Sequence, residues 1–593
     1  MIRTYIFSSV MLLLMSLTVS GASAQEVQTE GSVAERTGLS TVDPHSAVFQ
    51  ESEYPSAVQC AACHQKIFWE WASSNHAYAS ISPMFHKFEQ ALSELASGTI
   101  GTFCVRCHQQ VGTQRGEPRE QPLWERSLVA REGITCITCH RVSTEFGRVN
   151  GERHIQPGTI FEPMYNTGGP SNFPKVAADS DRYGVMTEPG GDNTPIHNGA
   201  IEFEQIERSE FCVSCHQVAV HPGIKLEVVW EQYRASPAAE MGITCQDCHM
   251  GSVPGRPNGY KTAPKAIVNG RIVGDPEAKH SNHAFYGPGY PIAHPGIFPF
   301  NPRSLNWEIQ EWLLFDWHTP WGVPAWEDEI EANGTDVEFP AVWAKREDRE
   351  TARYIIDQNQ NLLEQKKEDR VAVMENGSRL DGPFFDKGLP RVGEKFEFRY
   401  RLTNIDEGHN LPSGSLGAQP ELWLNVVLLD PDGEIVFESG YVDSHGDMAD
   451  IHSLDVAAGT VKHDDQLFNL QTKFLTTNVK GTDREMYLPV NFDIDQIPFI
   501  RPSGVPTSVL NHPPFIRMEG RSLPPFAHRD AVYKVPGKKI TKPGKYRLQV
   551  RMRSRAEPIY FMKFVGATPE MERTMNEWMI DLHPSAVEFT IEE

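Results

Sequence analysis

All ten cysteines of this chain lie in five copies of one short motif, C-x-x-C-H. Each motif is named below by its first cysteine. The motifs are Cys60-Cys63-His64, Cys104-Cys107-His108, Cys136-Cys139-His140, Cys212-Cys215-His216 and Cys245-Cys248-His249. Two thiols at this spacing can add to the two vinyl groups of one porphyrin, and the adjacent histidine can supply a nitrogen to its iron. The sequence therefore predicts five covalently attached haem c groups.

Two other uses of paired cysteines are a disulfide framework and zinc binding. Neither explains why a histidine directly follows every pair. Neither explains why no cysteine lies outside the pairs. Covalent haem accounts for both observations, so it is the preferred interpretation.

Four of the five motifs belong to a larger repeat, which has two copies with two motifs in each. Residues 103–140 contain "FCVRCHQQV", "LWE" and "GITCITCH", and residues 211–249 contain "FCVSCHQVAV", "VWE" and "GITCQDCH". The first cysteines of the two motifs are 32 residues apart in one copy and 33 in the other. The same order at nearly the same spacing indicates the internal duplication of a two-haem unit.

A six-coordinate haem needs a second axial ligand, and neutral imidazole is a common one. The preferred distal candidates flank the duplicated units: His76, His154, His197 and His283. His221 has no counterpart in the first unit, where Thr113 takes its place, so it is the candidate for the remaining haem. Other residues of the haem-rich region stay open as alternatives: His45, His86, His280, His294, Met84, Met164 and Met186.

The first residues of the chain predict export. Residues 1–24 join a basic Arg3 to an apolar stretch and the small residues Ala22-Ser23-Ala24, which is typical of a cleavable signal peptide. The mature chain would begin near Gln25, with a flexible arm over 25–50. The signal contains no cysteine for a lipid anchor, and no later apolar run of about 18 residues predicts a membrane span. The expected location is periplasmic or secreted.

The charge of the chain limits its partners. A net charge of −23 at pH 7 argues against nucleic acid, because phosphate contacts need a basic face. The acidic charge is explained first by solubility, and the alternative is that it steers the protein toward a cationic redox partner. The haem motifs make redox proteins, as electron donors and acceptors, the expected partners.

Composition changes divide the chain into parts. Residues 51–300 hold all five motifs and predict a mainly helical and irregular pentahaem domain. Residues 301–380 hold six of the twelve tryptophans and a charged helical pattern between Pro340 and Gly377. This pattern predicts a tryptophan-rich seam followed by a long connector helix over 341–376.

The last part of the chain, 381–593, alternates apolar and polar residues at period two. Strand-like segments occur at 395–404, 421–429, 434–441, 545–552 and 587–592, and Asp430-Pro431-Asp432-Gly433 is a turn sequence. These features predict a carboxyl-terminal antiparallel β-sandwich. The expected fold class is therefore α+β and multidomain.

The chain resembles the bacterial multihaem cytochromes c. The resemblance lies in the five motifs, in "WEWASSNHA" at 69–77, in "GITCQDCHM" and in "HSNHAF" at 280–285. In particular they are similar to the tetrahaem electron carriers related to hydroxylamine oxidoreductase. The resemblance implies bis-histidine haems in close pairs and supports His76 and His283 most, then His197. "GHNLPSG" at 408–414 resembles part of a β-rich tail found on some of these cytochromes. It leaves His409 open between an iron ligand and a structural loop residue, with the loop role preferred.

The expected function is electron transfer by a soluble pentahaem cytochrome c with mostly bis-histidine haems. One alternative is a multihaem oxidoreductase that acts on a small nitrogen or sulfur compound at one open iron. Another is a docking component of an outer-surface electron conduit. This chain departs from the tetrahaem carriers in its fifth motif and its long carboxyl-terminal half.

Overall fold

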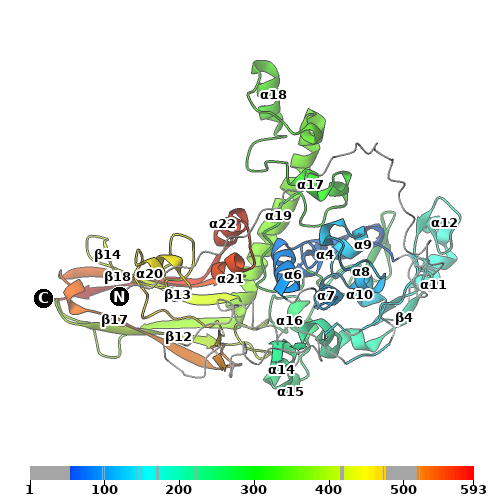
Figure 1. The fold of residues 1–593 in the computed structure, drawn as a ribbon. Coiled ribbons are helices and arrows are strands. Elements are labelled where there is room, and N and C mark those ends of the chain that lie inside the picture. Colours follow the sequence, from blue (N-terminus) through cyan, green and yellow to red (C-terminus); the bar gives the residue numbers. More distant parts are fainter. Residues whose placement is uncertain are drawn as a thin grey trace, which may run out of the picture. The chain divides into compact units, whose positions relative to one another are not determined.

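The computed structural model describes residues 54–593, apart from 96–97, 99, 143, 148–149, 152, 169–171, 221–223, 415–419, 472, 476–516 and 520. The predicted signal peptide, the predicted arm over 25–50, His45 and His221 lie outside the described residues. The described chain mixes helices with several antiparallel sheets, which confirms the predicted α+β class (Figure 1). Among these residues, no helix is both long and apolar enough to cross a bilayer.

Short helices and two-stranded sheets build the region up to residue 300. The helices are α3 (Ala57–Ala61), α4 (Gln65–Ala72), α5 (Asn75–Tyr78), α6 (Pro83–Leu95), α7 (Val105–His108), α8 (Gln110–Gln114), α9 (Leu128–Arg131), α10 (Cys136–His140), α11 (Phe173–Ala178), α12 (Ser180–Tyr183), α13 (Val213–His216), α14 (Val229–Arg234), α15 (Pro237–Glu240) and α16 (Cys245–His249). The strands are β1 (Met164–Asn166), β2 (Val185–Met186), β3 (Thr194–Pro195), β4 (Ala200–Glu202), β5 (Val218–Val220), β6 (Ile224–Glu227), β7 (Lys261–Thr262), β8 (Ala266–Val268), β9 (Arg271–Val273) and β10 (Lys279–His280).

The two copies of the sequence repeat have closely similar local structures. Each begins with a one-turn helix that ends at a motif histidine, α7 in the first copy and α13 in the second. Each ends with a five-residue motif helix, α10 or α16, preceded by a threonine in extended conformation. The glycines that open "GITC", Gly133 and Gly242, both have a φ of 71°. This left-handed conformation favours glycine, which explains why both copies keep it.

A cluster of aromatic side chains follows the motif region. Its buried members are Trp312, Phe315, Trp321, Trp343, Ala352, Ile355 and Ile356, contributed by α17 (Ile309–Trp312), the 3-10 turn Ala341–Trp343, α19 (Arg346–Gly377) and the loops between them. The Trp343 indole donates to the carbonyl of Glu311 at 2.9 Å. Helix α18 (Pro324–Asn333) adds Glu327, which is fully buried against Arg349.

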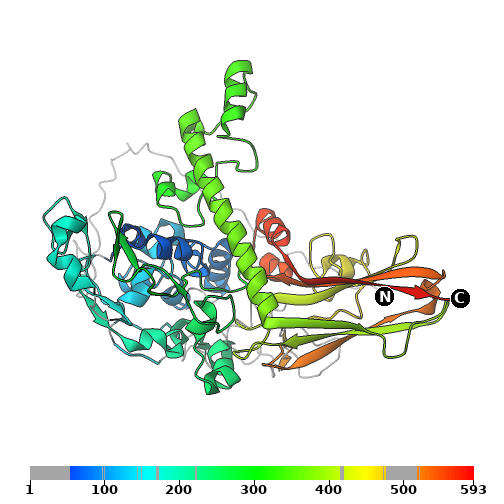
Figure 2. The ribbon, with the colours of Figure 1, turned by 180° about the vertical axis from the view of Figure 1, so that it is seen from behind.

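The long helix α19 begins later than the sequence predicts. The prediction placed its first turn next to Pro340, but Ala341–Trp343 form a 3-10 turn and the α-helix starts at Arg346. The reason is that Trp343 is fully buried in the aromatic cluster, which overrides the helical signal of the proline. The helix ends at Gly377 and passes directly into strand β11, as Figure 2 shows.

Two antiparallel sheets follow α19. One has the order β11-β12-β17 and the other has the order β14-β13-β18-β19. The strands are β11 (Ser378–Phe384), β12 (Phe396–Asn404), β13 (Glu421–Leu429), β14 (Ile435–Ser439), β17 (His528–Val535), β18 (Gly544–Arg555) and β19 (Ile580–Ile591). A further pair is formed by β15 (Lys473–Leu475) and β16 (Arg517–Glu519). The helices of this part are α20 (Leu454–Ala458), α21 (Ile559–Phe564) and α22 (Pro569–Glu577).

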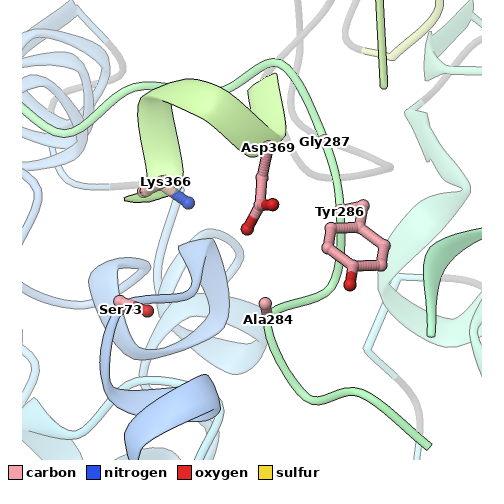
Figure 3. Close-up of a pocket in the computed structure, with 6 residues that line it drawn as sticks. All are labelled: Ser73, Ala284, Tyr286, Gly287, Lys366 and Asp369. Atoms are coloured by element: carbon pink, nitrogen blue, oxygen red, sulfur yellow. The ribbon is translucent and has the colours of Figure 1, made fainter. Parts of the chain in front are cut away.

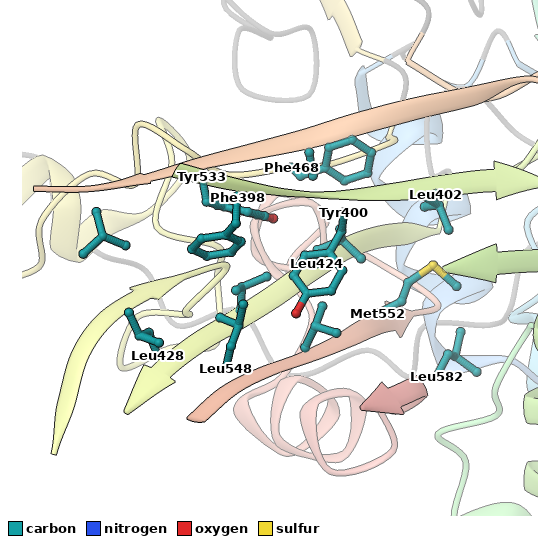
Figure 4. Close-up of a cluster of buried hydrophobic side chains, with 14 of the residues drawn as sticks. Phe398, Tyr400, Leu402, Leu424, Leu428, Phe468, Tyr533, Leu548, Met552 and Leu582 are labelled. Atoms are coloured by element: carbon teal, nitrogen blue, oxygen red, sulfur yellow. The ribbon is translucent and has the colours of Figure 1, made fainter. Parts of the chain in front are cut away.

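One hydrophobic core lies between the two sheets (Figure 4). Period-two alternation directs Phe398 and Tyr400 of β12 toward Leu424 of β13 and Leu548 of β18, all of which are buried. Outward residues of β12 are charged, and Arg401 donates to Asp530 of β17 at 2.7 Å. Burying each large apolar side chain stabilises the fold by about 1.5–3 kcal/mol relative to exposing it.

Candidate haem-binding site

Each C-x-x-C-H motif occupies a single helical turn. The backbone N–H of His64 donates to the Cys60 carbonyl at 2.9 Å, and the equivalent bonds measure 3.2 Å in the Cys104 motif and 3.1 Å in the Cys212 motif. The other two motifs lie wholly within α10 and α16. Residues three and four positions apart share one face of a helix, so both thiols and the imidazole lie on the same side. All ten cysteines are free, as attachment to a porphyrin requires.

The imidazole of each motif histidine is oriented through its Nδ1 atom. In four motifs this atom lies close to a backbone carbonyl oxygen: Lys265 for His64 (2.7 Å), Ala79 for His108 (2.9 Å), Tyr165 for His140 (2.8 Å) and Tyr286 for His249 (2.5 Å). Because a carbonyl oxygen only accepts, Nδ1 carries the proton and Nε2 keeps its lone pair. This tautomer is the one that offers Nε2 to a metal, so these residues fit haem iron.

In the remaining motif, the Cys212 motif, Nδ1 of the histidine lies near a carboxylate instead of a backbone carbonyl. His216 Nδ1 lies 3.3 Å from the Oε1 atom of Glu227, a residue at the end of β6 that the sequence analysis did not single out. Burial alone would lower the pKa of His216, but the Glu227 carboxylate and nearby thiolates raise it to about 9. A carboxylate partner strengthens a histidine as a metal ligand.

Three motif histidines face a second histidine from a distant part of the chain. The ring centroids are 6.3 Å apart for His216 and His76, 6.4 Å for His140 and His283, and 6.1 Å for His249 and His409. An imidazole nitrogen lies about 2.0 Å from a first-row metal, so two imidazoles on opposite sides of one metal have ring centres about 6 Å apart. All three spacings agree with this value.

His76 is positioned by the first copy of "GITC". It lies in α5, and its carbonyl oxygen accepts from the Ile134 N–H at 3.0 Å. A Cβ atom on Gly133 would lie only 2.5 Å from the same oxygen, so this close approach needs glycine. Burial, with smaller effects from His216 and Arg153, lowers the pKa of His76 to about 3. The ring is therefore neutral near pH 7, as a metal ligand must be.

His283 is positioned by Glu70 on α4. The Glu70 carboxylate accepts from the His283 backbone N–H at 3.1 Å and from His280 Nε2 at 2.7 Å. His283 Nδ1 is 2.8 Å from the carbonyl oxygen of Ser281, which again leaves Nε2 available. Burial is the main cause that lowers the pKa of His283 to about 4.

His197 lies near the first motif. Its Nδ1 atom is 2.7 Å from the carbonyl oxygen of Gly199. Burial lowers the pKa of His197 to about 4, and the neighbouring His64 lowers it further. His197 therefore lies near His64, the histidine of the Cys60 motif, and is neutral near pH 7. Its Nε2 atom takes no part in the bond to Gly199.

Several other candidate histidines use Nε2 elsewhere. His86 Nε2 is 2.6 Å from the carbonyl of Ser80, and His280 Nε2 is bonded to Glu70. His294 uses both nitrogens, with Nε2 at 2.9 Å from the carbonyl of Phe315 and Nδ1 accepting from a backbone N–H. The Nε2 atoms of these three histidines are therefore already hydrogen-bonded to protein oxygens and are not available to bind iron.

The surroundings of His154 and His108 differ from those of the paired histidines. His154 is exposed, and in the described part of the chain no ring contact joins it to a motif histidine. The His108 ring is stacked on Phe85, with centroids 4.0 Å apart and an interplanar angle of 5°. No second histidine ring faces it among the described residues. His64 also faces no second histidine ring among these residues, but His197 lies near it. The sequence left one haem without an assigned distal ligand and did not say which motif holds that haem.

Thiols of different motifs lie close to one another. Cys60 and Cys136, Cys107 and Cys215, and Cys212 and Cys245 are near enough to shift the pKa of the neighbouring thiol. Cys139 lies near Cys212 and Cys215, so the Cys136 motif also adjoins the Cys212 motif. The attachment points form one continuous cluster with the Cys212 motif at its centre. In the first repeat the contact of Cys136 is with Cys60, which lies outside the repeat.

A small pocket lies where α4, α19 and the chain just after His283 meet (Figure 3). It is lined by Ser73, Ala284, Tyr286, Gly287, Lys366 and Asp369. Burial, with a smaller effect from Arg370, lowers the pKa of Lys366 to about 7. The positive charge of Lys366 also helps to lower the pKa of His76, and Tyr286 supplies the carbonyl that orients His249. The pocket therefore belongs to the same site.

One comparison with known proteins, a family model, agrees with the motif chemistry. Residues 59–141 match the family model described as cytochrome c554 and c-prime, a stretch that contains the Cys60, Cys104 and Cys136 motifs. A penta-heme cytochrome c552 from Thermochromatium tepidum is similar in structure, with 15% sequence identity and a TM-score of 0.47 over 90% of this chain and 98% of that chain. No curated protein matches this chain. The family match and the five motifs support a multihaem c-type cytochrome.

Proposed function

We propose that this protein is an exported pentahaem cytochrome c that carries electrons between redox proteins. The state of the motif histidines supports this most. All five have Nδ1 directed at an oxygen, and three face a second imidazole at 6.1–6.4 Å. The relation to the carriers of the hydroxylamine oxidoreductase group stays a prediction from the motifs.

Each motif would hold one haem through its two cysteines, with its own histidine as the proximal ligand. The second axial ligands would be His76 opposite His216, His283 opposite His140 and His197 opposite His64. Haem held in this way supplies reversible one-electron chemistry, with a potential set by its ligands and its burial. The protein residues hold the distal imidazoles of His76, His283 and His197 neutral, orient the rings and cluster the attachment points. His221, which the sequence makes the candidate for the remaining haem, would then belong to the Cys104 motif.

The remaining parts of the proposal concern architecture. The aromatic cluster and α19 would connect a pentahaem domain to a β-sandwich made of the two sheets over one core. The acidic surface suits a soluble protein in the periplasm or outside the cell, with donor and acceptor proteins as partners.

A second candidate function is catalysis at the Cys104 motif. It is favoured by one observation, that His108 faces no second imidazole among the described residues. An open iron at this position could bind a small nitrogen or sulfur compound, which would make the protein a multihaem oxidoreductase.

Electron paramagnetic resonance of the fully oxidised protein separates the two functions. The carrier predicts low-spin ferric signals that stay unchanged when nitrite, hydroxylamine or cyanide is added. A high-spin signal from one haem that shifts with such a ligand would favour the enzyme. Protein that contains no haem would overturn both.

A further inference from the structure

We infer that His409, from the part of the chain that carries no motif, is the sixth ligand of the iron bound at the Cys245 motif. This inference rests on the proposed function and extends it, because it makes the carboxyl-terminal half a part of one redox centre. It replaces the structural loop role that the sequence favours for His409.

The first argument is the geometry of the two rings. The His409 and His249 rings are 6.1 Å apart and nearly parallel, with an interplanar angle of 13°. This spacing agrees with the other two facing pairs, His216 with His76 and His140 with His283. The residue that the sequence placed in a structural loop thus occupies the same position relative to its motif as the two distal candidates best supported by the resemblance.

The second argument is the state of the His409 nitrogens. Its Nδ1 atom is 3.0 Å from the carbonyl oxygen of Asn410, as His283 and His197 use Nδ1 on nearby carbonyls. The Nε2 atom lies 3.8 Å from the nearest Asp406 carboxylate oxygen, which is too far for a hydrogen bond. Nε2 is therefore free to bind a metal, in contrast to Nε2 of His86, His280 and His294.

The third argument is that the His409 loop is fixed against the motif region. The Asn404 side chain donates to the His409 carbonyl and to the Leu523 carbonyl, both at 2.9 Å. Gln232 of α14 accepts from the Asn410 N–H at 3.2 Å and from the Ser413 hydroxyl at 2.7 Å. A residue that only shaped its own loop would not need anchors in α14, a helix that lies between the Cys212 and Cys245 motifs.

Further contacts hold the other end of the same loop. The Ala238 N–H donates to the Glu407 carbonyl at 3.2 Å, and Arg256 donates to the Ile405 carbonyl at 3.2 Å. Arg256 also lies 3.7 Å from the Glu407 carboxylate. The loop is thus attached on both sides of His409, and this fixes the imidazole in a metal-binding position.

The test is His409→Gly in the full-length, haem-loaded protein, read by electron paramagnetic resonance. One haem per chain is expected to change from low-spin to high-spin, and added imidazole is expected to restore the low-spin signal. His463→Ala is the matched control, because His463 is exposed and forms an ion pair with the exposed Asp465; it should leave every signal unchanged. Imidazole rescue excludes a general disturbance of the loop, which imidazole would not repair.

His409→Met provides a second test if the glycine variant does not fold. It should keep the iron six-coordinate and add the near-infrared magnetic circular dichroism band of histidine–methionine ligation, with a raised potential for one haem. Unchanged spectra in the glycine variant, or no new band in the methionine variant, would overturn the inference and leave the proposed function intact. Wild-type protein without haem would instead refute the proposed function itself.

Discussion

Serine in place of both Cys212 and Cys215 is expected to reduce the yield of folded, exported protein several-fold. The reason is the central place of this motif, since its two thiols lie next to Cys245 and Cys107 and near Cys139, in three other motifs. A haem missing here would leave a cavity at the middle of the cluster, and the surrounding chain can close such a cavity only in part. The yield can be measured as haem-stained protein in the exported fraction.

Serine in place of both Cys60 and Cys63 is the matched control. This motif lies at one end of the cluster, where Cys136 is the only thiol of another motif found next to Cys60 among the described residues. The variant is expected to be exported at near wild-type yield and to lack one haem by mass. Equal losses in the two variants would contradict a central position for the Cys212 motif.

Alanine in place of Glu421 is expected to destabilise the carboxyl-terminal sheets by about 3–5 kcal/mol, because it leaves a buried guanidinium without its charge partner. Arg555 Nε donates to Glu421 Oε2 at 2.8 Å, and the two side chains are 0% and 1% exposed. They are directly opposed on β18 and β13. Circular dichroism during denaturant unfolding measures the loss.

Two further variants show whether burial causes this loss. The double variant Glu421→Leu with Arg555→Met should recover most of the stability, because an apolar pair can replace a buried ion pair. Glu570→Ala breaks the ion pair between Glu570 and Arg573, whose side chains are both exposed, by 55% and 56% respectively. It should cost less than about 1 kcal/mol. A small effect of Glu421→Ala would mean that water reaches Arg555.

The local part of the site could be predicted from the sequence, because a motif of five residues fixes its own helical turn. Its distal partners are long-range contacts, and the residue type alone does not select among them. His86, His280 and His294 stay open in the sequence as alternatives to the preferred candidates, yet their Nε2 atoms are bonded to protein oxygens. His409 lies far along the chain from the Cys245 motif, so only the fold brings them together.

The prediction of strands from the sequence is limited in the same way, because some strands depend on long-range pairing. The period-two pattern of β12 and β13 is clear because one face of each meets the core, and both strands lie within a residue or two of their predicted bounds. Strands β11 and β17 were missed. Strand β11 contains glycine and proline, and β17 carries charged residues on its outward face. Pairing with β12 determines both strands, and a single sequence does not reveal this pairing.

The most direct test of the account is the intact mass of the exported protein. We expect a chain processed near Gln25 that carries five covalent haems, one for each C-x-x-C-H motif. A consistent count of four would show that one motif does not bind haem. A mass equal to the processed chain alone would contradict the central claim that this protein is a multihaem electron carrier.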